Sequence, residues 1–338
     1  MNARTRRFLV VGIVAAVLIV LGTVARIWID VLWFDSLSYL SVFSTMLFTK
    51  LGLWLAFFAV FLLFAGLNLR VAFRKGQIAG LRIPRSSRPQ PGMPIELAQG
   101  APIEINRKAA AWTAAVAAVL FGAVLGGAAS GRWELLQKLL QRTEFGRVDP
   151  LFQKDISFYV FVLPFLNFLK NWALGAVALT SVIVASLHLF SGSVTYTDKR
   201  LKVGTRATRH LLFLALLISV LVAWHYWLKE YYLLLSPRGI IFGATYKDVK
   251  VVRLAYYLMI AVALFIAILI GVGASRRRFR SLLVGYGVLI AAAILTTGIV
   301  PGVVQQISVI PNQPQKELPY TKHNIEFTRA GYNLQDIE

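Results

Sequence analysis

Long apolar runs alternate with shorter polar segments along the chain. Seven of these runs extend over 18 to 22 residues and contain no Asp, Glu, Lys or Arg. About 20 apolar residues let a helix cross the hydrocarbon of a bilayer, whereas a barrel strand needs about 10 residues of alternating character. Because these runs do not alternate, we predict transmembrane helices at residues 8–25, 51–69, 109–130, 172–190, 211–228, 254–274 and 282–303.

The composition supports this interpretation. Hydrophobic residues make up 57% of the 338 residues and charged residues 15%, with a mean hydropathy of +0.66. A soluble chain of this size would not hide so much apolar surface, since much of any folded surface stays wet. We therefore predict an all-α integral membrane protein: a seven-helix bundle over residues 1–303 and a polar tail over 304–338. With no cysteine, disulfides, thiolate metal sites and cysteine-linked haem are excluded.

Basic residues gather in alternate polar segments. The N-terminal segment and the second, fourth and sixth loops hold 20 Lys or Arg and three acids, against 16 and 12 in the rest of the chain. Since cytoplasmic loops carry the excess of Lys and Arg, we predict a cytoplasmic N-terminus and an extracytoplasmic C-terminus. The first apolar run exceeds the 7 to 15 or so residues of a signal-peptide core, which favours an uncleaved anchor.

The formal charge of +21 is thus mainly a topology signal. No nucleic-acid-binding motif accompanies it, so we expect no nucleic-acid partner. Four arginines of the sixth loop are placed to bind anionic lipid headgroups at the cytoplasmic face. They are Arg276, Arg277, Arg278 and Arg280.

The predicted loops differ in character. The second loop contains five prolines and is expected to be an extended linker. The outer loops are aromatic, and residues 133–142 have the apolar spacing of an amphipathic helix lying in the interface. Their aromatic residues suit a headgroup belt, and three such loops could also pack into one cap.

Small residues predict close helix contacts. Glycines four apart bring helices together in membranes, and they occur in the third and seventh predicted helices. A conduction path is the alternative interpretation. The glycines are Gly122, Gly126, Gly127, Gly131, Gly298 and Gly302.

No cofactor or metal site is predicted. His188 and His210 could meet near the inner face, but two ligands without a carboxylate make a poor metal site. His225 lies near the opposite end of its helix. The predicted spans hold no carboxylate, which argues against a proton-driven pump, and no nucleotide-binding or hydrolase motif appears.

After residue 303 the chain becomes polar, and Thr321 is placed to cap a short helix running to Gly331. In four stretches the chain resembles uncharacterised protein family 0182, a family of large bacterial membrane proteins of unknown function. Residue patterns that match the family, such as Asp-Pro-x-Phe and Pro-Asn-x4-Glu-x-Pro-Tyr, occur here in the same order. The stretches are Trp33–Phe43, Asp149–Phe165, Arg238–Val249 and Pro311–Leu334.

The resemblance implies seven helices in a bacterial plasma membrane, followed by a large extracytoplasmic soluble region that would begin near the tail. Two positions depart from the family pattern. Lys247 stands where Thr is favoured, and Gln313 stands where an acid is favoured. Since the family has no established activity, the resemblance carries over no catalytic residue.

Three functions are open. We favour a non-catalytic anchor and docking platform for an extracytoplasmic domain in envelope assembly or maintenance, with an envelope protein or a second copy as partner. A transporter or lipid-handling permease is the alternative. A membrane-embedded enzyme using Asp149 and Asp155 is the third, although Asp149-Pro150 favours a turn and Asp155-x-Ser157 a helix cap. The candidate docking residues are Asp149, Asp155, Arg238, Asp248, Asn312, Glu317, Tyr320 and Arg329.

Overall fold

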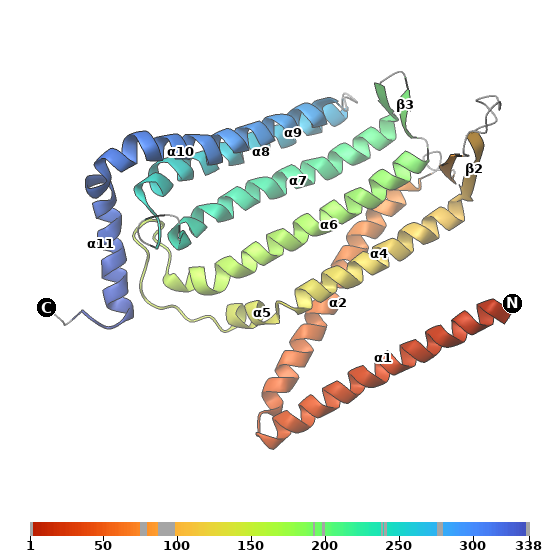
Figure 1. Ribbon diagram of the computed structural model, residues 1–338, viewed down its shortest axis with the longest axis horizontal. Coiled ribbons are helices and arrows are strands. Elements are labelled where there is room, and N and C mark those ends of the chain that lie inside the picture. The colour runs from red at the N-terminus through yellow and green to blue at the C-terminus, as the bar shows by residue number, and fades with distance from the viewer. Residues whose placement is uncertain are drawn as a thin grey trace.

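The computed structural model shows a row of long helices (Figure 1). α4 and the crossing helix α2 lie at one side of the row, followed by α6, α7, α8 and α9. α1 lies apart from the row and is connected to it by the turn into α2. The described residues are 3–74, 80–86, 99–191, 193–197, 200–237, 239, 242–275 and 280–335.

Within those residues, six helical stretches are long and apolar enough to cross a membrane: Leu40–Ala72, Arg107–Ser130, Phe158–Phe190, Thr205–Leu235, Asp248–Gly273 and Leu283–Gly331. Their α-helices are α2 (Leu40–Ala72), α4 (Arg107–Ser130), α6 (Leu163–Phe190), α7 (Thr205–Tyr231), α8 (Arg253–Ser275), α9 (Arg280–Ala293), α10 (Val300–Val304) and α11 (Gln313–Gly331). α1 (Ala3–Ser36) precedes them, and the short α5 (Trp133–Leu140) follows α4.

The prediction of a largely helical chain with long apolar helices is confirmed, and each of the last six predicted spans coincides with one of these stretches. The first predicted span is helical within α1, and a seventh crossing stays a prediction. The amphipathic helix expected near residue 133 is present as α5. Several helices are longer than predicted, because single-turn π or 3₁₀ segments extend them: Phe158–Val162, Tyr232–Leu235, Asp248–Val252, Ile294–Ile299, Gln305–Val309 and Ile310–Asn312.

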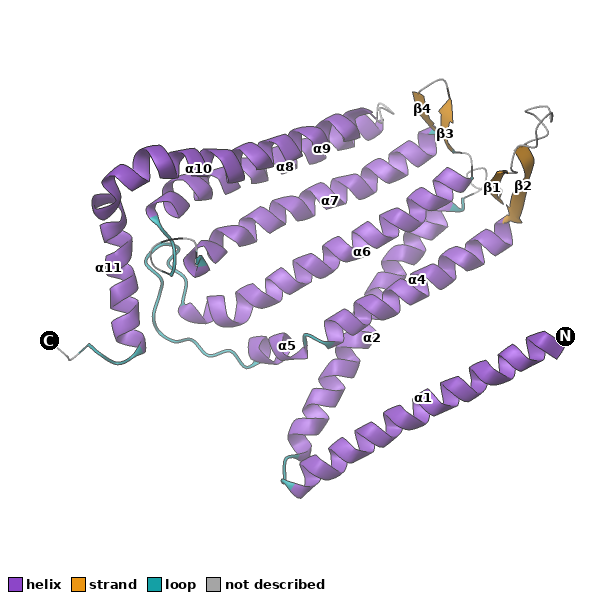
Figure 2. Cartoon of the chain, in the orientation of Figure 1, coloured by secondary structure: helices purple, strands orange, loops and turns teal. Residues whose placement is uncertain are grey.

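Two short antiparallel β-hairpins join helices of the otherwise helical chain, so the predicted all-α fold class holds (Figure 2). β1 (Gly80–Ser86) pairs with β2 (Gln99–Asn106), and β3 (Val194–Thr197) pairs with β4 (Arg200–Val203). The first hairpin joins the two ends of the proline-rich segment expected to be an extended linker. Pro84 has no backbone N–H to donate, and the register of β1 against β2 shifts at this point.

The polar segments separate to opposite ends of the helices. Both hairpins and the N-terminus lie at one end (Figure 1). α5, α11 and the turn at Ser38 between α1 and α2 lie at the other end. We call this second end the α11 end.

Small side chains bring α2, α4 and α6 together. Ala65 of α2 and Ala114 and Ala118 of α4 are buried in one cluster with Phe61 and Trp172. A second cluster joins α7, α8 and α9 and includes the fully buried Met259. Alanine allows close helix approach and loses no side-chain entropy on burial.

The predicted glycine positions fall into two groups. A Cβ at Gly122 would lie 3.0 Å from the ring of Phe58, and one at Gly126 would lie 2.9 Å from the carbonyl oxygen of Trp54. These two glycines therefore permit the contact between α4 and α2. A Cβ at the others would meet no heavy atom within 4 Å, or only its own helix at 3.6 Å, so their packing role stays a prediction: Gly127, Gly131, Gly298 and Gly302.

Most apolar side chains of the long helices face outward. In the most apolar 18-residue window of each stretch, only 11–39% of the residues are buried. Leu120 and Val124 of α4, for example, are 62% and 67% exposed. An apolar surface of this extent is typical of helices surrounded by lipid or by further apolar protein.

The glycine contact can be tested with neighbouring substitutions. Gly126→Ala should lower the free energy of unfolding by about 1–3 kcal/mol, because the new methyl forces α2 away from α4. Gly127→Ala, one residue along on an exposed position, should be neutral or should stabilise the helix by up to about 1 kcal/mol. Thermal unfolding in detergent, followed by circular dichroism, compares the two, and equal effects would contradict the assigned contact.

Candidate functional site

The connection from α5 to α6 folds around the carboxylate of Asp149. Asp149 is 4% exposed, and its Oδ1 accepts hydrogen bonds from the backbone N–H groups of Leu151 at 2.8 Å and Phe152 at 2.6 Å. Its Oδ2 accepts from the N–H of Lys154 at 3.0 Å and from the hydroxyl of Tyr159 at 2.7 Å. The predicted turn at Asp149-Pro150 is confirmed. Four donors on one buried carboxylate fix the loop to the start of the helix that follows.

Asp155 closes the same loop. Its backbone forms an antiparallel bridge with Val148, and its Oδ1 accepts from the N–H of Ser157 at 2.8 Å. The predicted helix cap is therefore confirmed. Hydrogen bonds from the hydroxyl and the amide of Ser157 lower the pKa of Asp155 below its usual value. A lowered pKa means that the cap is charged at neutral pH and that its contribution is lost as the pH falls through that value.

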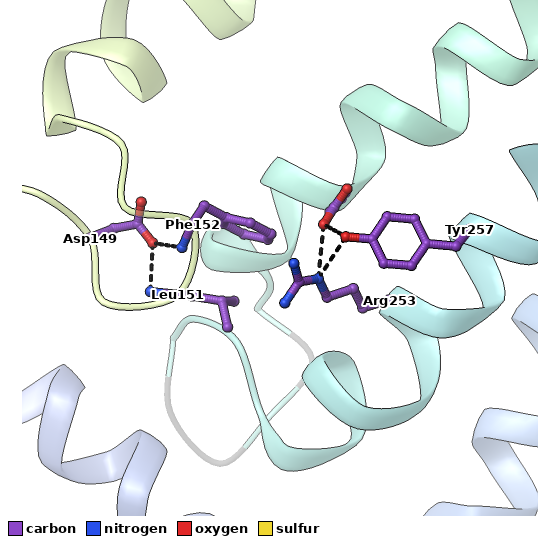
Figure 3. A network of polar contacts seen from close by, with 6 residues as sticks. Asp149, Leu151, Phe152, Arg253 and Tyr257 are labelled. Carbon is purple, nitrogen blue, oxygen red and sulfur yellow. Dashed lines mark hydrogen bonds and ion pairs between the residues drawn. The ribbon is translucent and has the colours of Figure 1, made fainter.

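The Asp149 loop meets an ionic network on α7 and α8 (Figure 3). Nε of Arg253 donates to Oε1 of Glu230 at 2.8 Å, and the hydroxyl of Tyr257 donates to the same oxygen. The guanidinium of Arg253 also lies 5.0 Å from the ring centre of Phe152. Glu230 is 5% exposed, so this pairing compensates a buried charge.

The helix that leads into α8 starts with a capping box. Oγ1 of Thr245 accepts from the N–H of Asp248 at 3.3 Å, and Oδ2 of Asp248 accepts from the N–H of Thr245 at 3.2 Å. Such a Thr-x-x-Asp pair satisfies two N–H groups that have no partner within the helix. Asp248 is fully buried. The observed role of Asp248 is therefore structural, and its docking role stays a prediction.

Glu317 of α11 completes the same helix start. Its Oε2 accepts from the N–H of Tyr246 at 3.0 Å, and the side chain is 6% exposed. A carboxylate is favoured at a helix N-terminus, where unpaired N–H groups and the helix dipole attract negative charge. This bond joins residues 71 apart. It fixes α11 to the start of α8.

Further contacts hold α11 across the α11 end. Nδ2 of Asn324 donates to the carbonyl oxygen of Phe242 at 2.7 Å. Nη2 of Arg147 lies 3.5 Å from Oε1 of Glu326, and the guanidinium of Arg147 is 4.7 Å from the ring centre of Phe327.

The bend that precedes α11 is fixed by Lys316. Its Nζ donates to the carbonyl oxygen of Ser308 at 2.9 Å and to the hydroxyl of the same residue at 2.6 Å. It also lies 5.2 Å from the ring centre of Tyr246. α11 is thus tied both to the preceding turn and to the start of α8, and it turns away from the line of α9 and α10 (Figure 1).

A cavity of about 330 Å³ lies between α11, the loop around Asp149 and the loop at Phe242. Asp149 and Tyr159 line it, but their side chains are already bonded to each other. Leu234, Phe242 and Phe327 contribute apolar walls. This cavity is mainly apolar, and α11 forms one of its sides.

The structure brings five of the eight predicted docking residues into this assembly. Asp149, Asp155, Asp248 and Glu317 act as described, and the ring of Tyr320 lies 6.4 Å from that of Tyr246. The remaining three are placed as follows: Asn312 precedes α11 without a side-chain capping bond, Nε of Arg329 donates to the carbonyl oxygen of Leu334 at 3.4 Å, and Arg238 lies outside the described residues.

Two further sequence predictions concern the helix cap at Thr321 and the four arginines expected to bind lipid headgroups. Thr321 does not cap a helix, because α11 already begins at Gln313, with Pro314 in its first turn. Thr321 lies inside α11 and donates to the carbonyl oxygen of Glu317 at 3.0 Å. Arg280 begins α9. The other three headgroup candidates, Arg276, Arg277 and Arg278, lie outside the described residues.

His188 and His210 lie close together, as predicted from their positions on neighbouring helices. Nε2 of His188 lies 3.4 Å from Nδ1 of His210, whose Nε2 lies 3.0 Å from Oδ1 of Asn68. In the part of the chain that the structure describes, no three His, Asp or Glu side chains gather as metal ligands. His225 pairs with Lys170 instead.

The comparison with known proteins identifies the family. Residues 7–338 match the group described as Uncharacterised protein family (UPF0182), and the chain belongs to that family. The resemblance found in the four sequence stretches is therefore confirmed. The family's description assigns no activity, and no solved structure matches the chain.

The relatives are bacterial proteins and are much longer. A UPF0182 protein of Thermobifida fusca is 33% identical over 347 residues, covering 100% of this chain and 32% of the relative. One of Nocardioides sp. is 32% identical over 341 residues, covering 100% and 33%. One of Frankia alni is 33% identical over 310 residues, covering 91% and 29%. The chain spans about a third of the length of these relatives.

The Asp149 loop generates a graded prediction. Asp149→Asn keeps one acceptor oxygen but leaves the N–H of Lys154 without its acceptor and alters the partner of Tyr159, so we expect a loss of roughly 2–4 kcal/mol in unfolding free energy. Tyr159→Phe removes one donor and should cost about 1 kcal/mol. Unfolding in detergent, followed by tryptophan fluorescence, measures both. A smaller loss for Asp149→Asn than for Tyr159→Phe would contradict the central role of the carboxylate.

Proposed function

We propose that this chain is a multi-pass protein of the bacterial plasma membrane that acts as a non-catalytic anchor and docking platform. Its N-terminus is cytoplasmic and its α11 end is extracytoplasmic. The docked element is an extracytoplasmic domain that serves envelope assembly or maintenance. In this proposal, α11 connects the membrane helices to that domain.

The observation that carries the proposal is the fixation of α11 by Glu317. A buried carboxylate on one helix that caps the start of another requires both helices to keep one relative position. Asn324 adds a second bond, to the loop at Phe242. An element that only linked the membrane part to a mobile tail would not require such contacts.

The distribution of charge supports the orientation. The hairpins and the N-terminus, at the end opposite α11 (Figure 1), belong to the segments that carry 20 basic and three acidic residues. This excess suits the cytoplasmic face. At that face, Arg276, Arg277, Arg278 and Arg280 are proposed to bind anionic lipid headgroups.

Two features favour an extracytoplasmic domain as the docked element: the length of the relatives and the exposed side of α11. About two thirds of each relative lies outside the part that matches this chain. This additional sequence leaves room for an extracytoplasmic domain. Leu318 and Ile325 of α11 are 52% and 53% exposed. Exposed apolar side chains on a helix that is held in place suit a protein partner.

The orientation can be tested with single cysteines, because the chain contains none. Thr143→Cys lies in the loop after α5, and Arg74→Cys follows α2; both positions are exposed. A maleimide that cannot cross the bilayer should label intact cells carrying Thr143→Cys. It should label Arg74→Cys only after the membrane is opened. The reverse pattern would contradict the proposed topology.

The docking role can be tested by cross-linking native membranes with a lysine reagent that does not cross the bilayer. Lys322 of α11 is exposed and should cross-link to the domain that the longer family proteins contain outside the matched region. Glu317→Ala should reduce this product several-fold, because α11 is no longer held at Tyr246.

Glu326→Ala is the matched control. Glu326 is on the same helix, but its side chain is 64% exposed and its ion pair with Arg147 is 3.5 Å long, so its removal should cost at most about 1 kcal/mol. It should leave the cross-link intact. Equal cross-linking in both variants, or no cross-link to that domain in the unmodified chain, would refute the docking role.

A further inference from the structure

A second cavity, separate from the one beside α11, has two lysines and several other polar side chains in its lining. Its volume is about 350 Å³, and it lies between α6, α7 and the start of α8. Lys170 and His225 lie on its inner side, while the exposed Lys229 and Asn171 lie at its rim. None of these residues takes part in the contacts that hold α11.

Lys170 is the unusual residue of this cavity. It is only 3% exposed, although it lies within a helix long and apolar enough to cross a membrane. Its Nζ lies 3.0 Å from Oδ1 of Asn167 and 3.0 Å from Nδ1 of His225. An ammonium has three N–H donors and no acceptor, so these contacts use two donors and require His225 to accept at Nδ1.

Among the described residues that line the cavity, none is acidic and able to balance this charge. Glu230, close by on α7, is already bonded to Arg253 at 2.8 Å. A buried cation without a counter-ion is costly. Lysines at membrane boundaries usually avoid that cost by extending the ammonium into water, but a side chain with 3% exposure does not.

The remaining polar groups suit an anion with several oxygens. Asn171 carries amide donors, Tyr232 carries a hydroxyl donor, and Lys229 supplies a second ammonium at the rim. The side chain of Asn167 is already hydrogen-bonded to Lys170 and Tyr232. Leu228, Leu233 and Tyr256 form apolar walls. Ammonium and amide donors around a tetrahedral or planar oxyanion make short, charge-assisted hydrogen bonds.

The position of the cavity along the helices narrows the class of anion. Lys170 stands two residues before the apolar run 172–190, and Lys229 stands one residue after the run 211–228. Both lysines therefore lie where hydrocarbon gives way to headgroups if these runs cross the bilayer. Phosphate is the common anion at that depth.

We propose that this cavity binds a phosphate group, with Lys170 as its main cationic contact and Lys229 at its entrance. The phosphate belongs either to the headgroup of an anionic lipid or to free inorganic phosphate. This site is independent of the docking role of α11, and its failure would leave that role untouched.

Two probes distinguish the sources. The purified chain, delipidated in detergent, is titrated with phosphatidylglycerol and followed by native mass spectrometry, and separately with radiolabelled inorganic phosphate. Saturable binding of the lipid alone assigns the site to a headgroup, and saturable binding of inorganic phosphate assigns it to the free ion. Lys170→Met should weaken the observed binding about tenfold or more, because a charge-assisted hydrogen bond is lost.

Lys50→Met is the matched control. Lys50 lies on α2 in another long apolar helix, and its ammonium is 5.5 Å from the ring centre of Trp133, away from the cavity. This variant should bind like the unmodified chain.

Folding of Lys170→Met is checked by thermal unfolding, which should show no loss of stability, since an uncompensated buried charge is replaced by an apolar chain of similar length. Should that variant fail to fold, Lys229→Gln decides, because its exposed position tolerates substitution and it should also weaken binding. The proposal would be overturned if neither probe bound saturably, or if the lysine variant that folds bound the probe as well as the unmodified chain does.

Discussion

The dominant constraint on this chain is the extent of its exposed apolar helical surface. In an apolar surrounding, backbone groups must be satisfied within the helices, so turns, hairpins and charges move to the helix ends. The structure follows this rule: the hairpins lie at one end, and the loops with α11 lie at the other (Figure 2). Hydrogen bonding at the α11 end therefore has to satisfy every turn and helix start that the long helices leave there.

Three carboxylates meet that requirement in the same way. Asp149 accepts from the N–H groups of its own loop, Asp248 accepts within a capping box, and Glu317 reaches the same helix start from α11. Each is buried and each satisfies backbone donors. The α11 end is consequently a connected structure in which a loop, a helix start and α11 fix one another, which is the property that a docking platform needs.

The sequence predicts the long helices well because their signal is local. It predicts the turn at Asp149, the cap at Asp155 and α5 for the same reason. The Thr-x-x-Asp signature at Thr245 could also have been found. The bond from Glu317 to Tyr246 joins residues 71 apart, and no local pattern encodes it. The predicted spans exclude Lys170, Glu230 and Arg253, because only runs without charges define them. In the structure each of these residues lies within a helix and has a partner on a neighbouring helix.

The fixation of α11 is the central claim, and backbone hydrogen exchange at Tyr246 tests it most directly. In lipid nanodiscs, this amide should exchange slowly, because Glu317 accepts its hydrogen in a buried site. Glu317→Ala should speed its exchange by an order of magnitude or so, while the loop around Asp149 keeps its protection. Fast exchange at Tyr246 in the unmodified chain, or no change in the variant, would mean that α11 is not held at the start of α8.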